Sequence, residues 1–121
     1  MKHLLIVDDQ PNIRKMLRLS LASHFSIAEA ENADMALEMI LQKKPAGIVL
    51  DVMMPGSMNG FDLCERIKGD SGLMDIHVAL VTACGQVADQ ELGQELGADA
   101  YFVKPFSPMA LAQHLKTALL P

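Results

Sequence analysis

Short apolar runs alternate with helical patterns along the whole chain. The apolar runs lie at residues 4–7, 25–28, 47–50, 78–81 and 101–103. Helical patterns follow them at residues 11–21, 33–41, 61–68, 87–96 and 108–119. Because short apolar runs and longer segments of helical period follow one another in turn, the pattern predicts five strands alternating with five helices.

Proline, capping and glycine residues mark the ends of these helices. Pro11 and Pro108 suit the first position of a helix, and Asn32 and Ser107 suit the N-cap position before it. The helix at 87–96 contains Gly93, which lowers its intrinsic stability. We therefore expect five well-delimited helices, of which the fourth is the weakest.

The central apolar runs are typical of parallel strands that helices cover on both faces, because they are continuous rather than alternating. The alternation of strands and helices, joined by right-handed crossovers, then predicts a doubly wound α/β fold. With 121 residues the chain is expected to form a single domain over residues 1–121.

The charge and composition of the chain exclude several classes of protein. A net charge of −5 argues against a domain that grips a nucleic-acid backbone by itself. Cys64 and Cys84 lack the spacing of a disulfide framework, which fits a reducing compartment. The run at 4–7 is too short for a signal peptide and no stretch is long enough to span a bilayer, so a soluble, cytoplasmic protein is expected. The 4 histidines show no ligand spacing and are expected at the surface.

Polar side chains lie where four of the strands end. They are Asp8 and Asp9, Asp51, Thr82, and Lys104. In an open parallel sheet, ligands bind outside the carboxyl ends of the strands where the winding direction reverses, and with the strand order 2-1-3-4-5 these aspartates converge there. Three neighbouring carboxylates repel one another, and a hard divalent cation such as Mg²⁺ relieves that repulsion.

This combination suits the transfer of a phosphoryl group to a carboxylate. A cation on either side of Asp51 would neutralise charge on the phosphoryl oxygens during attack on phosphorus, with Lys104 as one of the two. Each polar residue alone has an ordinary structural explanation, such as a helix cap or a surface charge. Their joint occurrence at the same end of successive strands favours a functional site.

Five segments resemble the receiver domain of two-component response regulators, across essentially the whole chain. They are LIVDD at 5–9, VLDVMMP at 49–55, VTA at 81–83, GAD at 97–99 and KPF at 104–106. The resemblance implies the flavodoxin-like receiver fold, with a five-stranded parallel sheet in the order 2-1-3-4-5 and five flanking helices. It implies a phosphorylation-dependent switch, with no turnover substrate of its own, that takes its phosphoryl group from a histidine kinase or histidine phosphotransfer protein. A downstream effector protein or domain would be its target, in a stand-alone receiver or in a longer regulator.

The resemblance implies a role for each acidic position. Asp51 corresponds to the phosphoacceptor. Asp8, Asp9, Asp51 and the backbone carbonyl of Met53 would hold Mg²⁺, with Mn²⁺ as an alternative.

It also implies a switch at the ends of the last two strands. Thr82 and Lys104 would contact the phosphoryl oxygens, and Tyr101 occupies the position of the switch aromatic that moves with Thr82. The Lys104–Pro105 bond would be cis. Phosphorylation would alter the face formed by the fourth helix, fifth strand and fifth helix, and a phosphorylation-dependent homodimer is compatible with such a change.

The chain departs from the usual receiver pattern in one loop. Residues 54–60 contain one residue more than the usual Met-Pro-Gly-Met-Asp-Gly, most simply Ser57, so the metal geometry or the start of the third helix could be shifted. We expect an active site with an altered rate, and a degenerate receiver that acts as a constitutive protein-interaction module is the nearest alternative. Met53 and Cys84, two residues after Asp51 and Thr82, cannot orient an attacking water, which predicts a long-lived phosphoryl group.

Two other classes of protein, a flavin-binding module and a phosphatase, could share this α/β architecture. A flavin-binding module would need a phosphate loop rich in hydroxyl groups and glycine after the first strand, which Asp8-Asp9-Gln10-Pro11 does not provide. A phosphatase related to haloacid dehalogenases would need a second acid two residues after its nucleophile. Pro11 stands at that position, which argues against the phosphatase.

Overall fold

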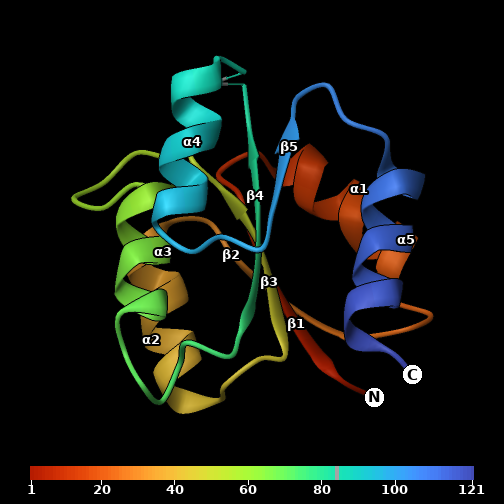
Figure 1. The fold of residues 1–121 in the computed structure, drawn as a ribbon. Helices are drawn as coiled ribbons and strands as arrows, with labels where there is room; N and C mark the ends of the chain where they lie inside the picture. The colour runs from red at the N-terminus through yellow and green to blue at the C-terminus, as the bar shows by residue number, and fades with distance from the viewer. Residues whose placement is uncertain (84) are drawn as a thin grey trace.

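The computed structural model describes residues 1–83 and 85–121, in which five strands alternate with five helices (Figure 1). The strands are β1 (His3–Val7), β2 (Ser26–Ala30), β3 (Gly47–Asp51), β4 (His77–Thr82) and β5 (Ala100–Val103). The helices are α1 (Pro11–Leu21), α2 (Ala33–Gln42), α3 (Gly60–Lys68), α4 (Val87–Glu95) and α5 (Pro108–Leu119). The predicted alternation is therefore confirmed.

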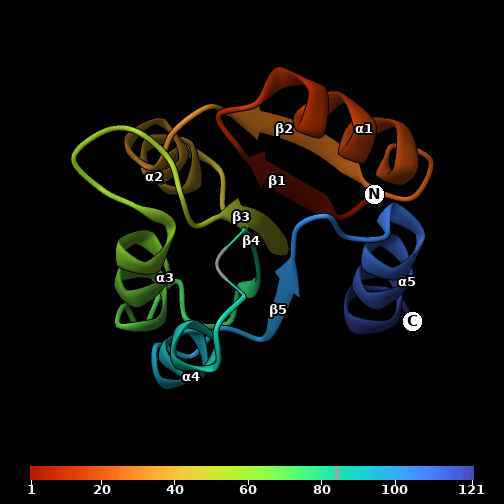
Figure 2. The same ribbon diagram turned by 90° about the horizontal axis from the view of Figure 1, so that it is seen from above.

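The strands form one parallel sheet in the order β2-β1-β3-β4-β5, as predicted. Leu4 of β1, for example, is paired with Ile27 of β2 on one side and with Gly47 of β3 on the other. Helices α1 and α5 cover one face of the sheet, and α2, α3 and α4 cover the other (Figure 2). This is the doubly wound, flavodoxin-like arrangement, in which the winding direction changes between β1 and β3.

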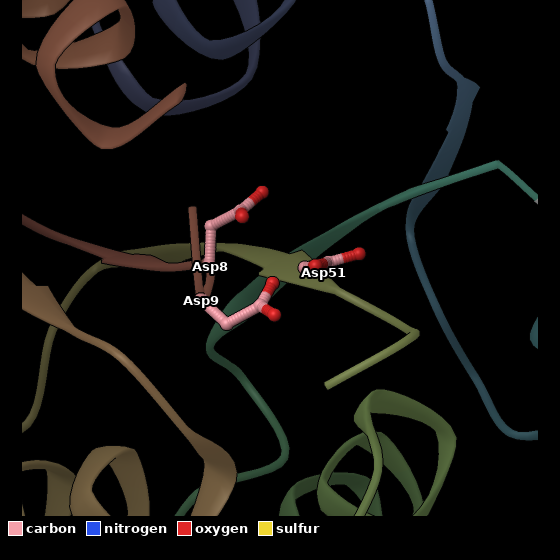
Figure 3. A group of neighbouring side chains, drawn as sticks. All are labelled: Asp8, Asp9 and Asp51. Carbon is pink, nitrogen blue, oxygen red and sulfur yellow. The ribbon is translucent and has the colours of Figure 1, made fainter. Parts of the chain in front are cut away.

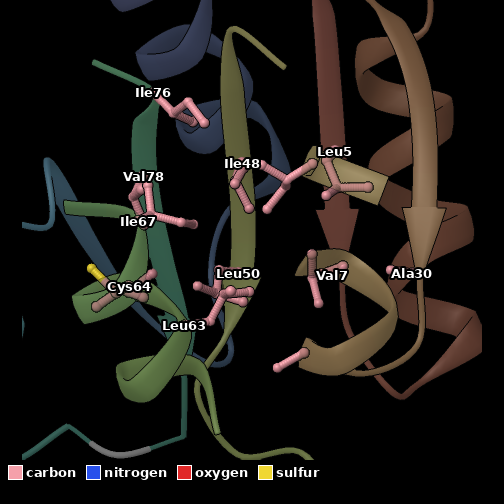
Figure 4. Packing of buried hydrophobic residues seen from close by; sticks show 14 of the residues in the cluster. Leu5, Val7, Ala30, Ile48, Leu50, Leu63, Cys64, Ile67, Ile76 and Val78 are labelled. Atoms are coloured by element: carbon pink, nitrogen blue, oxygen red, sulfur yellow. The ribbon is translucent and has the colours of Figure 1, made fainter. Parts of the chain in front are cut away.

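Apolar side chains pack against both faces of the sheet and form two clusters. Successive side chains of a strand point to opposite faces, so Leu5 and Val7 join the cluster beneath α2 and α3, whereas Leu4 and Ile6 join the cluster beneath α1 and α5. Figure 4 shows part of the first cluster, in which β1 and β3 meet α3 through aliphatic side chains. The continuous apolar runs of the sequence thus supply both layers of core.

The second strand begins later than the sequence pattern predicts. Residues 25–28 were expected, but β2 is Ser26–Ala30. Phe25 is 1% exposed and packs in the cluster under α1 and α5, and its N–H donates to the carbonyl of Leu21, 3.0 Å away. Because β2 lies at the edge of the sheet, it includes the charged Glu29, which Arg14 and Arg18 pair with at 3.1 and 2.6 Å. An apolar run therefore located this strand but not its limits.

The predicted helix caps are present. The Asn32 side chain accepts a hydrogen bond from the N–H of Met35 at 2.8 Å, and Ser107 Oγ accepts one from the N–H of Ala110 at 3.1 Å. The Lys104–Pro105 bond is cis, as expected. Among the described helices, none combines the length and apolar character needed to cross a membrane.

Helix α4 has the features expected of the least stable helix. Its N-cap residue, Gln86, makes no side-chain capping hydrogen bond. The residue that α4 buries is Gly93, and a Cβ added there would lie 3.1 Å from Cδ2 of Tyr101 and 3.2 Å from Cδ1 of Leu80. Contact between α4 and the sheet thus depends on the absence of a side chain at this position.

Candidate functional site

Three acidic side chains meet at the carboxyl end of the sheet, as predicted. Asp51 is the last residue of β3, and Asp8 and Asp9 follow β1, the strand beside it. Figure 3 shows the three carboxylates converging, and one oxygen from each lies within 4.8 Å of the others. Asp8 and Asp51 are 2% and 3% exposed, whereas Asp9 is exposed. Such a set of oxygen donors, open on one side, fits a hard divalent cation.

Lys104 supplies the positive charge at this cluster. It follows β5 directly, and its Nζ lies 3.0 Å from Oδ2 of Asp8 and 3.6 Å from Oδ2 of Asp51. One ammonium group opposite three carboxyl groups leaves a negative balance when all three are ionised. A second cation would therefore be stabilised here.

Backbone groups hold the two buried carboxylates in place. The N–H of Gln10 donates to Oδ1 of Asp8 at 2.9 Å, and the N–H of Met53 donates to Oδ1 of Asp51 at 3.3 Å. Arg14 Nη1 donates to the carbonyl oxygen of Asp8 at 2.7 Å, which fixes the turn after β1. The acids are positioned by the fold itself before any ligand binds.

The pKa of the Asp51 carboxyl group is raised to about 7. Burial is the main cause and the negative charge of Asp8 adds to it, while Lys104 and the N–H of Met53 act in the opposite direction. Asp51 is thus a carboxyl group held in an environment that opposes its ionisation. A bound cation would favour the ionised, nucleophilic form.

A small cleft gives access to Asp51 from solvent. Its volume is about 190 Å³, and its lining consists of Asp9, Gln10, Asp51, Met53, Ala83 and Lys104. The cleft therefore presents the acceptor, the exposed acid and the ammonium group together. That combination suits an ion and a small anionic group.

Thr82 and Tyr101 lie where the sequence predicts them, on neighbouring strands. Thr82 is fully buried at the end of β4, and its carbonyl accepts from the N–H of Lys104 at 2.7 Å. Tyr101 is half-buried on β5, with its ring close to Gly93 of α4. Tyr101 therefore contacts α4, and Thr82 is hydrogen-bonded to Lys104, whose ammonium group contacts Asp8 and Asp51. Cys84 lies outside the described residues.

The additional residue in the loop after β3 makes its side-chain contact with α2. Ser57 Oγ donates to the carboxylate of Asp34 in α2, with distances of 3.2 and 3.1 Å to its two oxygens. Helix α3 then starts at Gly60, with a reciprocal capping box between Asn59 and Asp62. A Cβ at Gly60 would collide with the backbone oxygen of Asp51, so glycine is required where this helix approaches β3. The third helix is therefore well formed despite the longer loop.

The structure also adds contacts that the sequence pattern did not predict. Arg14 and Gln10 position Asp8, but one arginine in an amphipathic helix and one glutamine in a turn carry no distinctive signal. The histidines were expected at the surface, and this is wrong for His77 and His114, which are partly buried and in contact with each other. They lie 37 positions apart in the chain, so no local spacing could have indicated the contact.

Comparisons with known proteins agree with this geometry. A family model described as "Response regulator receiver domain" matches residues 4–116. The chain is similar to the receiver domain of a DNA-binding response regulator from Colwellia psychrerythraea, with a TM-score of 0.92 at 28% identity and all of both chains covered. It is also similar to chemotaxis protein CheY4 of Vibrio cholerae, with a TM-score of 0.88 at 27% identity and 99% of both chains covered.

The chain is also similar, at higher sequence identity, to curated response regulators. The phosphate regulon transcriptional regulatory protein PhoB of Pseudomonas aeruginosa is 41% identical over 119 residues, which are 98% of this chain and 52% of that protein. The probable transcriptional regulator ycf27 of Guillardia theta is 43% identical over 117 residues, which are 95% of this chain and 44% of that protein. The chain thus spans about half the length of these relatives. With the family model matched over nearly its full length, the chain belongs to the response regulator receiver domain family.

Proposed function

We propose that this domain is a phosphorylation-dependent signalling switch in which Asp51 accepts the phosphoryl group. The observation that supports it most is the position of Asp51, buried beside two further acids and 3.6 Å from the ammonium group of Lys104. A carboxyl group with a pKa raised to about 7 can be ionised by a cation that binds beside it. Nucleophile and counter-charge are therefore present in one cleft.

A magnesium ion is the cofactor that this donor set fits, with Mn²⁺ as an alternative. Asp8, Asp9 and Asp51 would hold it, together with the backbone carbonyl of Met53, and the ion would neutralise charge on the phosphoryl oxygens. Asp9, which is exposed, leaves one side of the site open for the incoming group.

Phosphoryl transfer would then proceed by direct attack from the carboxylate. An oxygen of Asp51 forms the new bond to phosphorus while the bond from phosphorus to the histidine nitrogen of the donor breaks, and the imidazole leaves with that electron pair. Lys104 Nζ is placed to stabilise the phosphoryl oxygens, and the Thr82 hydroxyl would donate to one of them. The domain assists this single transfer to itself and has no separate turnover substrate.

The phosphoryl group would act on the α4-β5-α5 face. It adds nearly two negative charges and three acceptor oxygens at Asp51, and Thr82 and Lys104 would move toward them. Because the Tyr101 ring lies against Gly93, the residue that α4 buries, a turn of the ring into space vacated by Thr82 would shift α4. Val87 and Val103 on this face are 71% and 36% exposed, which suits a surface that changes partners.

The partners follow from this chemistry. The phosphoryl donor would be a sensor histidine kinase or a histidine phosphotransfer protein. Beside Lys104 lies an apolar cleft lined by Ile13, Met16 and Phe106, which would bind part of such a donor. The output would pass to an effector domain or protein, and the relatives that are transcriptional regulators make a DNA-binding effector the first candidate. A cytoplasmic location and a phosphorylation-dependent homodimer belong to the same proposal.

The proposal is tested by the intact mass of the protein after incubation with Mg²⁺ and acetyl phosphate. We expect the gain of one phosphoryl group, which is absent in Asp51→Ala and absent when Mg²⁺ is chelated. The lifetime of the product is measured in the same samples after removal of the donor. A half-life of seconds would contradict the prediction of a long-lived phosphoryl group.

The same experiment addresses the alternative of a degenerate receiver. If the mass does not change and Mg²⁺ does not bind, the domain is a constitutive interaction module rather than a switch. If the mass increases equally in Asp51→Ala, another residue is the acceptor and the proposed role of Asp51 is wrong.

A further inference from the structure

A second cluster of ionisable groups lies at the opposite, amino end of the sheet. His77 is the first residue of β4. His114 belongs to α5, which covers one face of the sheet together with α1. Asp99 lies just before β5, and Lys68 is the last residue of α3. Residues from two helices, one strand and one loop meet there, and the proposed switch uses none of them.

The two imidazole rings are in direct contact through their outer nitrogens. Nε2 of His77 lies 2.9 Å from Nε2 of His114, with ring centroids 5.0 Å apart and the ring planes inclined by 39°. Two N–H groups cannot point at each other across this distance, so at least one nitrogen presents its lone pair and accepts from the other. A single proton then bridges two ligand-type nitrogens.

A divalent metal ion can take the place of that proton. Nitrogens bound at about 2.0–2.1 Å in adjacent positions at a right angle lie about 2.9 Å apart, and in tetrahedral positions about 3.3 Å apart. The observed spacing therefore matches the right-angle geometry that Cu²⁺ and Ni²⁺ adopt with nitrogen and oxygen ligands, while Zn²⁺ requires a small separation of the rings. A rotation of the rings directs both lone pairs at one point, and water supplies the remaining ligands.

The surroundings of His77 resemble those of a metal-bound histidine. Its other nitrogen, Nδ1, lies 3.9 Å from Oδ2 of Asp99. This is longer than a hydrogen bond, but a small rotation of the ring would bring Nδ1 to the carboxylate, the group that commonly orients such a ligand. Asp99 is itself fixed, because the N–H of Val78 donates to it at 2.8 Å and Lys68 Nζ lies 2.9 Å away. The edge-to-face contact between Phe102 and His114 holds the second ring.

We propose that His77 and His114 form a binding site for a late first-row divalent cation, with Cu²⁺ or Ni²⁺ preferred to Zn²⁺ and Asp99 as the residue that orients His77. The site is separate from the acidic cleft and does not depend on phosphorylation. It links β4 directly to α5. A metal ion bound there would strengthen the attachment of this helix to the sheet.

The test is a titration of the protein, without a histidine tag and with Mg²⁺ in excess, by Ni²⁺ alone. The excess of Mg²⁺ competes for the acidic cleft. NMR signals of the imidazole carbon-bound protons provide the assignment, and the exposed His24 serves as the internal control. We expect the signals of His77 and His114 to broaden first because Ni²⁺ is paramagnetic, and Zn²⁺ to shift the same two pairs of signals at higher concentration. Equal broadening of all four histidines, or broadening that follows the acidic cleft alone, would overturn the proposal.

Substitutions separate ligands from neighbours. His114→Gln and His77→Gln should each weaken Ni²⁺ binding at least tenfold in calorimetric titrations, whereas His24→Gln at an exposed position should leave it unchanged. Asp99→Asn should weaken binding by about 10-fold if it orients His77. The use of both glutamine variants keeps the test decisive if one does not fold. Undiminished binding in the folded variants would show that the pair is only a structural hydrogen bond.

Discussion

The acidic groups at the two ends of the β-sheet differ in how well positive charges and hydrogen-bond donors balance them. At the carboxyl end, three carboxyl groups share one ammonium group, and burial together with the charge of Asp8 raises the pKa of Asp51 to about 7. At the amino end, the carboxylate of Asp99 is paired with the N–H of Val78 and with the ammonium group of Lys68. Burial alone would raise its pKa, but the Val78 N–H and the Lys68 ammonium group outweigh burial and hold the pKa below its usual value.

This difference separates the part of the molecule that is prepared for a ligand from the part that stabilises the fold. Crowded carboxyl groups make the ligand-free protein less stable than it could be, and a bound cation removes that penalty. Paired groups such as Asp99 and Lys68 add stability without any ligand. Substitutions at the two ends should therefore change stability in opposite directions.

Asp51→Asn should produce the largest change, a stabilisation of the metal-free protein by about 2–4 kcal/mol at pH 8. The amide removes the ionised form that burial and Asp8 oppose, while it preserves the shape of the side chain. Urea unfolding in the presence of a chelator measures the effect. Saturating Mg²⁺ should reduce the gap, because it stabilises the wild type more than the variant. A variant that is less stable than the wild type without metal would show that the carboxyl end is not strained by charge.

Asp99→Asn should have the opposite sign, with a loss of about 1–2 kcal/mol in the free energy of unfolding. Asn retains one acceptor for the N–H of Val78 but loses the charge that pairs with Lys68, whose side chain is only 14% exposed. Asp75→Asn is the matched control, because Asp75 pairs with Lys44 on the exposed surface and should contribute much less. Equal effects at the two positions would remove the distinction between a structural pair and a surface pair.

The pH dependence of the free energy of unfolding should distinguish the carboxyl end of the sheet from the amino end in the wild-type protein, without any substitution. A carboxyl group with a raised pKa destabilises the fold when ionised, so as pH falls from 8 to 6.5 the protonation of Asp51 should add about 1 kcal/mol to the stability of the metal-free protein. Burial lowers the pKa of His77, with the Asp99 charge opposing it, so its contribution is lost as pH falls below about 6.5. Below about pH 6.5 the Asp51 and His77 contributions oppose each other, so the rise in the stability of the wild type should level off. Asp51→Asn should lose the rise and keep the fall, and a rise that persists in this variant would contradict the assignment to Asp51.

Most of the fold and the acidic cluster could be predicted from the sequence. Both depend on short apolar runs and on the polar residues at their ends, which a parallel sheet places in known positions. Asp8 follows the apolar strand β1 and Asp51 ends the apolar strand β3, and parallel strands bring such residues to one edge. The contact between His77 and His114 could not be predicted in this way, because it depends on how α5 is rotated against β4. Likewise the limits of β2 depend on pairing at a sheet edge, where charged residues are tolerated.

The smallest effect is expected at the loop that carries the extra residue. Ser57 and Asp34 are both exposed, so the coupling energy from a double-mutant cycle of Ser57→Ala and Asp34→Asn should be about 0.5 kcal/mol. The Mg²⁺ affinity of Ser57→Ala should match that of the wild type, since the Ser57 hydroxyl contacts Asp34 of α2 and none of Asp8, Asp9 and Asp51. A severalfold change in that affinity would mean that the loop tip helps to set the geometry of the acidic cluster. Ser57 would then contribute to the geometry of the acidic cluster at the carboxyl end of the sheet.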